Sequence, residues 1–115
     1  MGRTQVKGKH GEDLAAGFLR KQGFRILARN VRTPYGEIDL ICHDGHLTMF
    51  VEVKYRSNKR FGDPEDAVVG KKHDRLSQSV EWYVTERHVQ GDYRLDVVTV
   101  HEAKPWKVLH HIQDV

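Results

Sequence analysis

The sequence predicts a single α/β domain, residues 1–115, in which a mixed β-sheet is flanked by helices. Apolar residues recur at helical spacing in two stretches, and five further apolar runs have the length of strands and end in turn residues. No repeat or linker divides the chain, whose 115 residues suit one hydrophobic core. The expected order of elements is αβββαββ.

The first helix and the first strand follow from local patterns near the N-terminus. A helix is expected over about residues 8–22, because apolar side chains recur at helical spacing and Gly23 follows as a C-cap. Residues 24–31 have the pattern of a strand. Arg25 and Arg29 both fall on its polar side, which is typical of a strand at the edge of a sheet.

A β-hairpin is expected next. Residues 33–36 have turn chemistry, and they precede two apolar runs, 37–42 and 47–55. The Asp44-Gly45 step between these runs is a strong hairpin signal. The two runs are therefore expected to pair as antiparallel strands.

The second half of the chain is expected to add a helix and two strands. Residues 62–65 have the pattern of a helix entry, with a capping aspartate and a proline in the first turn. An apolar stripe predicts a helix over about residues 71–85. Residues 93–100 and 106–112 have strand patterns with a turn between them, so they are expected to complete the sheet.

The charge of the chain is divided unevenly. Residues 1–60 carry 12 Lys or Arg and 6 Asp or Glu, whereas residues 61–115 carry 7 and 10, so the net charge of +3 conceals a basic half and an acidic half. A basic half favours a polyanionic partner such as nucleic acid. The alternative is an ordinary solvated surface.

Cysteine content and hydropathy indicate the compartment. Cys42 is the single cysteine, so no internal disulfide can form, and the composition fits a reducing cytosol. No apolar run approaches the roughly 18 residues that cross a bilayer, and the N-terminus lacks a signal-peptide core. We therefore expect a cytoplasmic protein without membrane insertion.

Strand alternation gathers charged side chains on one face of the hairpin. If the Asp-Gly step is the whole loop, the numbers of paired residues sum to 89, and Asp39 is a diagonal neighbour of Glu52. Glu37 and Lys54 then project from the same face as these two carboxylates. The opposite face is expected to carry the apolar side chains Ile38, Leu40, Met49, Val51 and Val53.

Such an acidic face requires neutralisation, because carboxylates close together on a half-buried surface repel one another. Lys54 or a hard divalent cation can supply the positive charge. Glu12 adds a further acid, since it shares the inward stripe of the first helix with Ala15 and Leu19. Glu37 is an additional site acid or serves the local structure. The alternative is a solvated strand pair and a helix-start glutamate.

Two blocks, residues 36–41 (GEIDLI) and 50–56 (FVEVKYR), resemble the YraN-like family of small bacterial proteins. Members of that family are regarded as endonucleases of the PD-(D/E)XK superfamily, similar to archaeal Holliday junction resolvases. The resemblance covers nearly the whole chain and extends to Glu12, Arg29-Asn30, Lys72, Leu76 and residues 94–98. Ile38 replaces the superfamily's nominal proline, as is usual in this family. The implied fold is restriction-endonuclease-like.

The resemblance also implies roles for individual residues. Asp39 and Glu52 would bind Mg²⁺ or Mn²⁺, and the backbone carbonyl of Val53 would complete the protein ligands. Lys54 would position or activate the attacking water and stabilise charge on the phosphate. Glu12 corresponds to a helix acid of the junction resolvases that assists metal or water binding. These four side chains, Glu12, Asp39, Glu52 and Lys54, are the expected catalytic residues.

The expected partner is DNA, in particular branched or structured DNA, and a homodimer would suit a symmetric four-way junction. The candidate phosphate contacts are Arg56, Lys59, Arg60, Lys71, Lys72 and Arg75. Two alternatives are a nucleic-acid-binding protein that keeps the nuclease fold without cutting, and a protein-interaction module whose basic face meets an acidic partner.

Two other polar groups are not assigned to the active site. His110 and His111 are adjacent in a strand and face opposite sides, and no spacing typical of structural zinc is present, so a zinc site is not expected. Asp96 lies beside Arg94 in a late strand. We expect Asp96 to pair with a basic residue rather than to ligate a metal.

Overall fold

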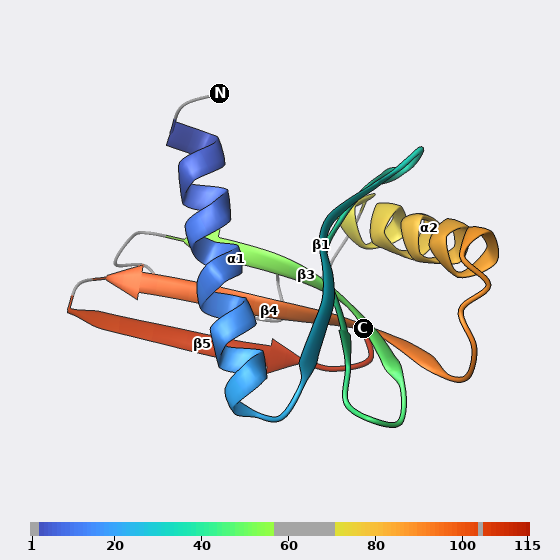
Figure 1. Ribbon diagram of the computed structural model, residues 1–115. Coiled ribbons are helices and arrows are strands. Elements are labelled where there is room, and N and C mark those ends of the chain that lie inside the picture. Colours follow the sequence, from blue (N-terminus) through green and yellow to red (C-terminus); the bar gives the residue numbers. More distant parts are fainter. Residues whose placement is uncertain (1–2, 57–70, 104) are drawn as a thin grey trace.

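The computed structural model describes residues 3–56, 71–103 and 105–115 (Figure 1). Its elements are α1 (Arg3–Lys21), β1 (Arg25–Thr33), β2 (Gly36–His43), β3 (Thr48–Arg56), α2 (Lys71–Glu86), β4 (Tyr93–Ala103) and β5 (Trp106–Ile112). The predicted helix entry at residues 62–65 lies outside the described residues. No helix in the described ranges is long and apolar enough to cross a membrane.

The five strands form one mixed sheet in the order β1-β2-β3-β4-β5. All neighbours are antiparallel except β3 and β4, which are parallel. A parallel pair needs a crossover connection, and α2 lies in that connection. The mixed sheet and the edge position of β1 confirm two expectations from the sequence.

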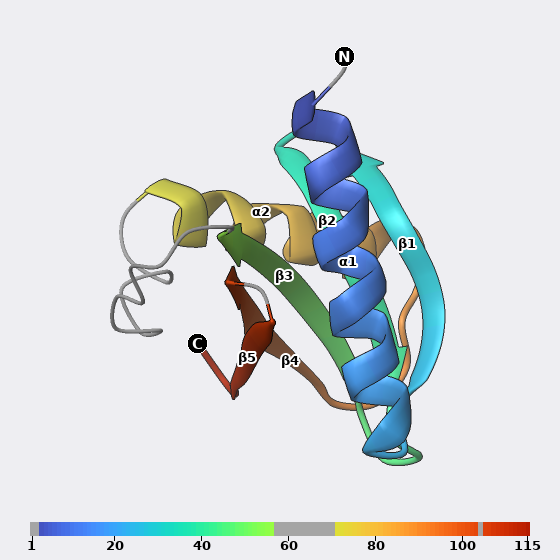
Figure 2. The same cartoon turned by 90° about the vertical axis from the view of Figure 1, so that its left-hand side faces the viewer.

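The two helices cover opposite faces of the sheet (Figure 2). Apolar side chains of α1 pack on one face, and those of α2 pack on the other. The buried cluster on the α2 side consists of Ile38, Ile41, Phe50, Leu76 and Val80. The predicted arrangement of a sheet flanked by helices is therefore confirmed.

The hairpin register differs from the expected one by two residues. Leu40 pairs with Val51 and His43 with Thr48, so that paired numbers sum to 91 rather than 89 and four residues form the loop. The cause is the Asp44 side chain, whose Oδ1 accepts hydrogen bonds from the backbone N–H groups of residues 46 and 47 at 2.8 and 2.9 Å. Such bonds stabilise a longer turn. Because the shift is an even number, each β3 residue keeps its predicted face.

The alternation of side chains along β2 is broken, and this corrects the predicted apolar face. Ile38 and Leu40 were expected on one face, but Ile38 packs in the α2 cluster and Leu40 in the α1 cluster. Asp39 lies between them. A strand can shift its side chains in this way only where its backbone departs from the regular pleat.

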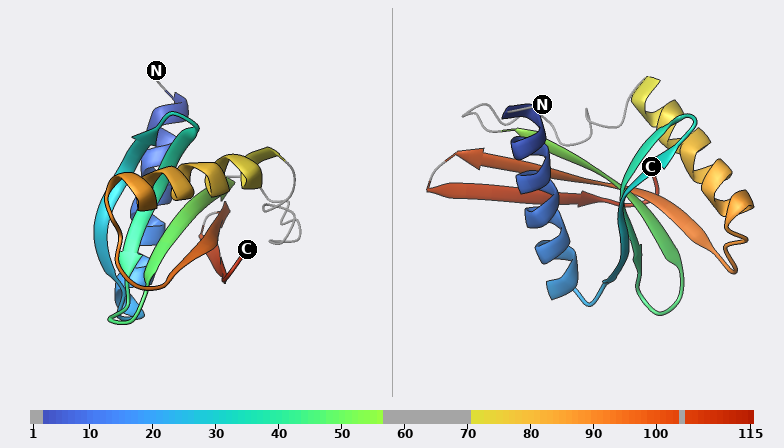
Figure 3. Two further views of the ribbon diagram at one scale, coloured as in Figure 1. Left: turned by 90° about the vertical axis from the view of Figure 1, so that its right-hand side faces the viewer. Right: turned by 45° about the horizontal axis from the view of Figure 1, so that its top comes forward.

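A kink in β1 and β2 explains the broken alternation. Asn30 has a left-handed backbone with φ of 54°, and the β1–β2 ladder places it opposite the irregular residue Asp39. The β2–β3 pairing ends at Leu40. Beyond the kink, the hairpin of β1 and β2 turns away from β3 and runs beside α2 (Figure 3). We call the divergence of β2 and β3, at Glu37, Asp39, Glu52 and Lys54, the fork.

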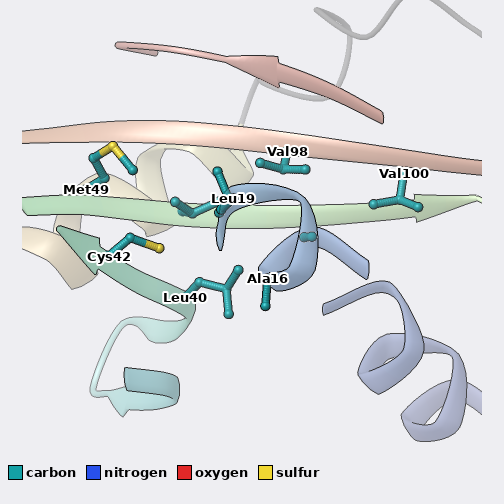
Figure 4. Close-up of a cluster of buried hydrophobic side chains, with 9 residues drawn as sticks. Ala16, Leu19, Leu40, Cys42, Met49, Val98 and Val100 are labelled. Carbon is teal, nitrogen blue, oxygen red and sulfur yellow. The ribbon is translucent and has the colours of Figure 1, made fainter. Parts of the chain in front are cut away.

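Helix α1 lies very close to the sheet. Its residues Ala15, Ala16 and Leu19 are fully buried in the core cluster on the α1 side of the sheet (Figure 4). The sheet side of that cluster consists of Leu40, Cys42, Met49, Val51, Val98 and Val100. A Cβ added at Gly11 would stand 2.8 Å from the Cβ of Tyr55 in β3. The small residues of α1 therefore bring Glu12 down onto the fork.

Candidate active site

Three carboxylates meet where α1 crosses the kink of β2. Glu12, Glu37 and Asp39 each place one oxygen within 4.8 Å of the others, and they form a possible metal-binding group among the described residues. The Glu12 side chain is 12% exposed, Asp39 is half-buried and Glu37 is exposed. The arrangement is compatible with a bound cation, because oxygen ligands from several elements converge on one place.

Asp39 lies at the centre of this group. Burial raises its pKa to about 7, a hydrogen bond from the backbone N–H of Val53 (2.8 Å) opposes the shift, and the charges of Glu12, Glu52 and Glu37 add to it. The carboxylate form of Asp39 is thus held in an unfavourable, negatively charged environment. A proton or a cation relieves that repulsion.

Glu12 has two partners, Asn30 and, through a long ion pair, Arg29, but one of its oxygens forms no hydrogen bond within the described part of the chain. Burial raises its pKa, while a hydrogen bond from Asn30 and the charge of Arg29 oppose the change. Its Oε1 atom is buried without a hydrogen-bond partner among the described residues. The guanidinium of Arg29 is 3.8 Å from this oxygen but 2.6 Å from Asp13 Oδ1. A buried carboxylate oxygen left in this state is costly unless something positive binds it.

Glu52 and Lys54 form a separate pair on β3. The Lys54 Nζ atom donates to Glu52 Oε1 at 2.6 Å, and the lysine side chain is only 10% exposed. Their shared face agrees with the alternation expected for β3. Glu52 acts on Asp39 through its charge, yet it is not part of the three-carboxylate group. The structure therefore brings Glu37 and Glu12 to Asp39 and keeps Glu52 with Lys54.

A cavity of about 240 Å³ opens at the fork on the α2 side. Its walls are Gly36, Glu37, Glu52, Lys54, Arg75, Leu76 and Ser79. Arg75 is exposed, and it places a guanidinium group at the same cavity as the ammonium group of Lys54. Because Glu37 belongs to both the cavity and the carboxylate group, the two parts of the site are continuous.

The fork is attached to both helices. On the α2 side, the hydroxyl oxygens of Thr33 and Ser79 are 2.9 Å apart and hydrogen-bonded. On the α1 side, His10 Nε2 lies 2.9 Å from Glu102 Oε1, and the Tyr55 hydroxyl donates to the same oxygen at 2.7 Å. These contacts fix the two helices, and hence Glu12 and Arg75, relative to the strands.

The other predicted phosphate contacts are only partly described. Arg56 is exposed at the end of β3, where it donates to the backbone carbonyl of Tyr55 at 3.2 Å. Lys59 and Arg60 lie outside the described residues. Lys71 and Lys72 belong to the first turn of α2, but their side chains are outside the described part of the chain.

Most of the chain matches a known protein family. The model of "Uncharacterised protein family UPF0102" matches residues 11–100. The chain belongs to family UPF0102. The matched range contains every residue of the fork, and it confirms the YraN-like resemblance seen in the sequence.

Curated UPF0102 proteins match most of the chain. The protein from Syntrophotalea carbinolica is 43% identical over 94 residues, 81% of this chain and 76% of the relative. The protein from Neisseria meningitidis serogroup C is 40% identical over 107 residues, 92% and 93% of the two chains. The Thermodesulfovibrio yellowstonii protein is 36% identical over 114 residues, 99% and 97% of the two chains. Their names give the family and no reaction.

Some neighbours of the carboxylates in this UPF0102 protein do not follow from its sequence patterns. Arg29 was expected on the polar side of an edge strand, and Asn30 belongs to the family resemblance, but both act on Glu12. Ser79, which is hydrogen-bonded to Thr33, is another such residue. A polar serine on the inward side of α2, among Leu76 and Val80, is the signal that indicates such a contact.

Proposed function

We propose that this UPF0102 protein is a metal-dependent endonuclease that hydrolyses phosphodiester bonds in DNA, with branched or structured DNA as the favoured substrate. The observation that carries the proposal is the fork, where three carboxylates lie beside Lys54 and Arg75. Negative groups that bind a cation and positive groups that bind a phosphate thus share one site. The mixed sheet with a helix on each face is compatible with the nuclease fold that the sequence resembles.

The donor set fits a hard divalent cation, Mg²⁺ or Mn²⁺. All candidate ligands are oxygens, and the buried Glu12 Oε1 has no hydrogen-bond partner among the described residues. Asp39 and Glu12 would hold the cation together with Glu52 and the Val53 carbonyl, and Glu37 would add a carboxylate from the exposed side. When bound, such a cation lowers the pKa of a water molecule and polarises the phosphate.

Lys54 and Arg75 would act on the phosphate. In the described structure the ammonium group of Lys54 is held by Glu52 at 2.6 Å. If Glu52 turns to a cation, Lys54 loses this partner and can stabilise the negative charge that develops on the phosphate. Arg75 faces the same cavity from α2 and can orient the DNA backbone with its planar guanidinium group.

A cleavage panel tests the proposal. Purified protein is incubated with four-way junction, flap and single-stranded DNA in Mg²⁺ or Mn²⁺, and products are separated on denaturing gels. We expect Asp39→Ala and Lys54→Ala to reduce cleavage by at least about 10²-fold, which is typical of losing a group that acts in the transition state. Asp92→Asn, which changes an exposed carboxylate away from the fork, is the matched control. Cleavage that survives both alanine variants contradicts the proposal.

The Glu52–Lys54 ion pair favours one alternative, a nucleic-acid-binding protein that does not cut. A lysine that remains paired with Glu52 has its charge partly offset, so it stabilises negative charge on a phosphate less well. Calorimetry with Mn²⁺ and DNA-binding assays separate the two functions. Binding of DNA without any binding of Mn²⁺, and without cleavage of any substrate, selects this alternative.

A further inference from the structure

The outer face of α2 carries an aromatic residue that the core does not explain. Leu76 and Val80 point from α2 into the buried cluster. The opposite stripe of the helix consists of Gln78, Glu81, Trp82, Thr85 and Glu86, at spacings of three, four, seven and eight. Trp82 is absent from both core clusters of the described residues. Trp82 is half-buried among exposed polar neighbours, so part of its side chain remains open to the solvent.

Trp82 forms one wall of a surface hollow. Tyr35, at the turn between β1 and β2, lies across from the helix, and the hollow between them measures about 340 Å³. Figure 3 shows this turn beside α2. The full lining is Tyr35, Gln78, Glu81, Trp82, Thr85 and Glu86. This volume is at the lower end of ligand pockets, which suits one side chain or a small ligand.

The hollow is pre-formed, because the turn is attached to the helix. The backbone N–H of Tyr35 donates to Thr33 Oγ1 at 3.1 Å. The same Thr33 oxygen is hydrogen-bonded to Ser79 of α2 at 2.9 Å. Tyr35 is 49% exposed even so, which leaves much of its ring available for contact. An occupant would thus meet two aromatic walls that need little reorganisation.

The charge of the hollow is negative. Glu81 and Glu86 are exposed, and neither forms an ion pair within the part of the chain that the structure describes. The lining contains no lysine or arginine. Arg87, the nearest cation in sequence, lies over the ring of Tyr83, 5.9 Å from its centroid. The hollow therefore attracts cations and repels phosphate groups.

We propose that this hollow binds an arginine side chain presented by a protein partner. A guanidinium group is planar, stacks on aromatic rings and pairs with carboxylates through two hydrogen bonds. Trp82 and Tyr35 supply the rings, and Glu81 and Glu86 supply the carboxylates. A nucleic-acid base could also stack on the rings, but the flanking phosphates would then meet both glutamates. The proposal is independent of nuclease activity.

The hollow adjoins the fork. Tyr35 and Gln78 line the hollow, and the next residues along the chain, Gly36 and Ser79, line the cavity that contains Lys54. A partner that inserts an arginine at Trp82 would therefore sit beside the proposed nuclease site.

Nuclear magnetic resonance titration tests the proposal. The probe is a short acetylated peptide with two arginines, and the matched peptide carries neutral citrulline at both positions. We expect the indole N–H signal of Trp82 to shift and saturate at millimolar arginine peptide, with binding at least about tenfold weaker for the citrulline peptide. Trp106, which is 74% exposed on β5, is the internal reference and should not shift with saturation.

Variants at the hollow complete the test. Trp82→Ala and the double change Glu81→Gln with Glu86→Gln should each weaken peptide binding at least about fivefold. The double variant is isosteric and confined to exposed side chains, so it serves if the tryptophan variant does not fold. Three results overturn the proposal: no saturable shift up to about 10 mM peptide, equal binding of the citrulline peptide, or a Trp82 shift produced by a thymidine oligonucleotide instead.

Discussion

Two aspartates in neighbouring parts of the sheet have opposite electrostatic surroundings. Asp96 in β4 is fully buried, and burial alone would raise its pKa. Hydrogen bonds from His111, from Arg94 and from the backbone N–H of Asp114 outweigh burial and lower the pKa to about 2. Asp39 in β2 receives one backbone hydrogen bond and faces other acids, and its pKa rises to about 7.

The difference separates a structural ion cluster from a site that lacks positive charge of its own. The chain itself supplies all the positive charge that Asp96 requires, so that region is complete in the folded protein. Around Asp39 the carboxylates exceed the nearby cations, and folding alone does not remove their repulsion. An excess of buried negative charge is unfavourable for stability, and it is the condition under which a divalent cation binds well.

The largest effect on stability is expected from breaking the ion cluster of Asp96, Arg94 and His111. Asp96→Ala leaves Arg94 and His111 without their buried partner, so the free energy of unfolding should fall by about 3–5 kcal/mol. Urea denaturation at pH 7 measures this change. The exposed Asp92→Ala provides the comparison and should alter stability by less than about 0.5 kcal/mol. A loss below about 1 kcal/mol for Asp96→Ala would mean that the cluster is not a structural ion cluster.

At Asp39 we expect the opposite effect, a rise in the free energy of unfolding. Asp39→Asn removes a charge from among the acids while its amide oxygen can still accept from the Val53 N–H. In chelator at pH 8, above the Asp39 pKa, the free energy of unfolding of the variant should exceed that of the unaltered protein by about 2–4 kcal/mol. This is the upper range for a pKa shift of this size. The same change should weaken Mn²⁺ binding at least about tenfold in calorimetry. Destabilisation by Asp39→Asn would contradict the electrostatic account of the fork.

A smaller effect is expected from pH alone. The Asp39 pKa is raised in the folded protein, so its stabilising contribution is complete below about pH 4 and is lost as pH rises through about 7. Metal-free protein should lose roughly 1–3 kcal/mol of stability over this window. The effect is reduced because burial lowers the pKa of His101, so that the folded protein loses stability from this histidine as the pH falls below about 6.5.

Denaturant midpoints measured from pH 4 to pH 8 in chelator test this profile. Asp39→Asn should flatten the curve, and Mn²⁺ at pH 8 should restore the lost stability by binding the folded state. If the pH profile of Asp39→Asn were the same as that of the unaltered protein, the carboxylates of the fork would not control stability in this range.

The elements of the fold could be predicted because each has a local cause. The apolar stripe of α2 and the faces of the β3 side chains depend on periodicity within one segment, and both predictions are confirmed. Pairing of Asp96 with Arg94 also follows from their positions two residues apart on one strand face. Such features need no knowledge of how distant segments pack.

The details of the fork could not be predicted in the same way. The hairpin register depends on hydrogen bonds of the Asp44 side chain, which the sequence signal of an Asp-Gly turn does not reveal. The faces of Ile38 and Leu40 depend on a kink opposite Asn30, where strict alternation fails. Glu12 was found from its helical stripe, but its convergence with Glu37 rather than Glu52 results from tertiary packing.

Gly11 shows how a residue without a side chain can set the spacing of a group of carboxylates. Glycine inside a helix costs about 1 kcal/mol relative to alanine, yet a methyl group here would meet Tyr55 at 2.8 Å. Alanine would therefore push α1 away from β3 by a distance on the order of 1 Å. Glu12 is the next residue, so its carboxylate would retreat from Asp39 by a similar amount. Gly11 thus acts as a spacer that sets how closely Glu12 approaches Asp39.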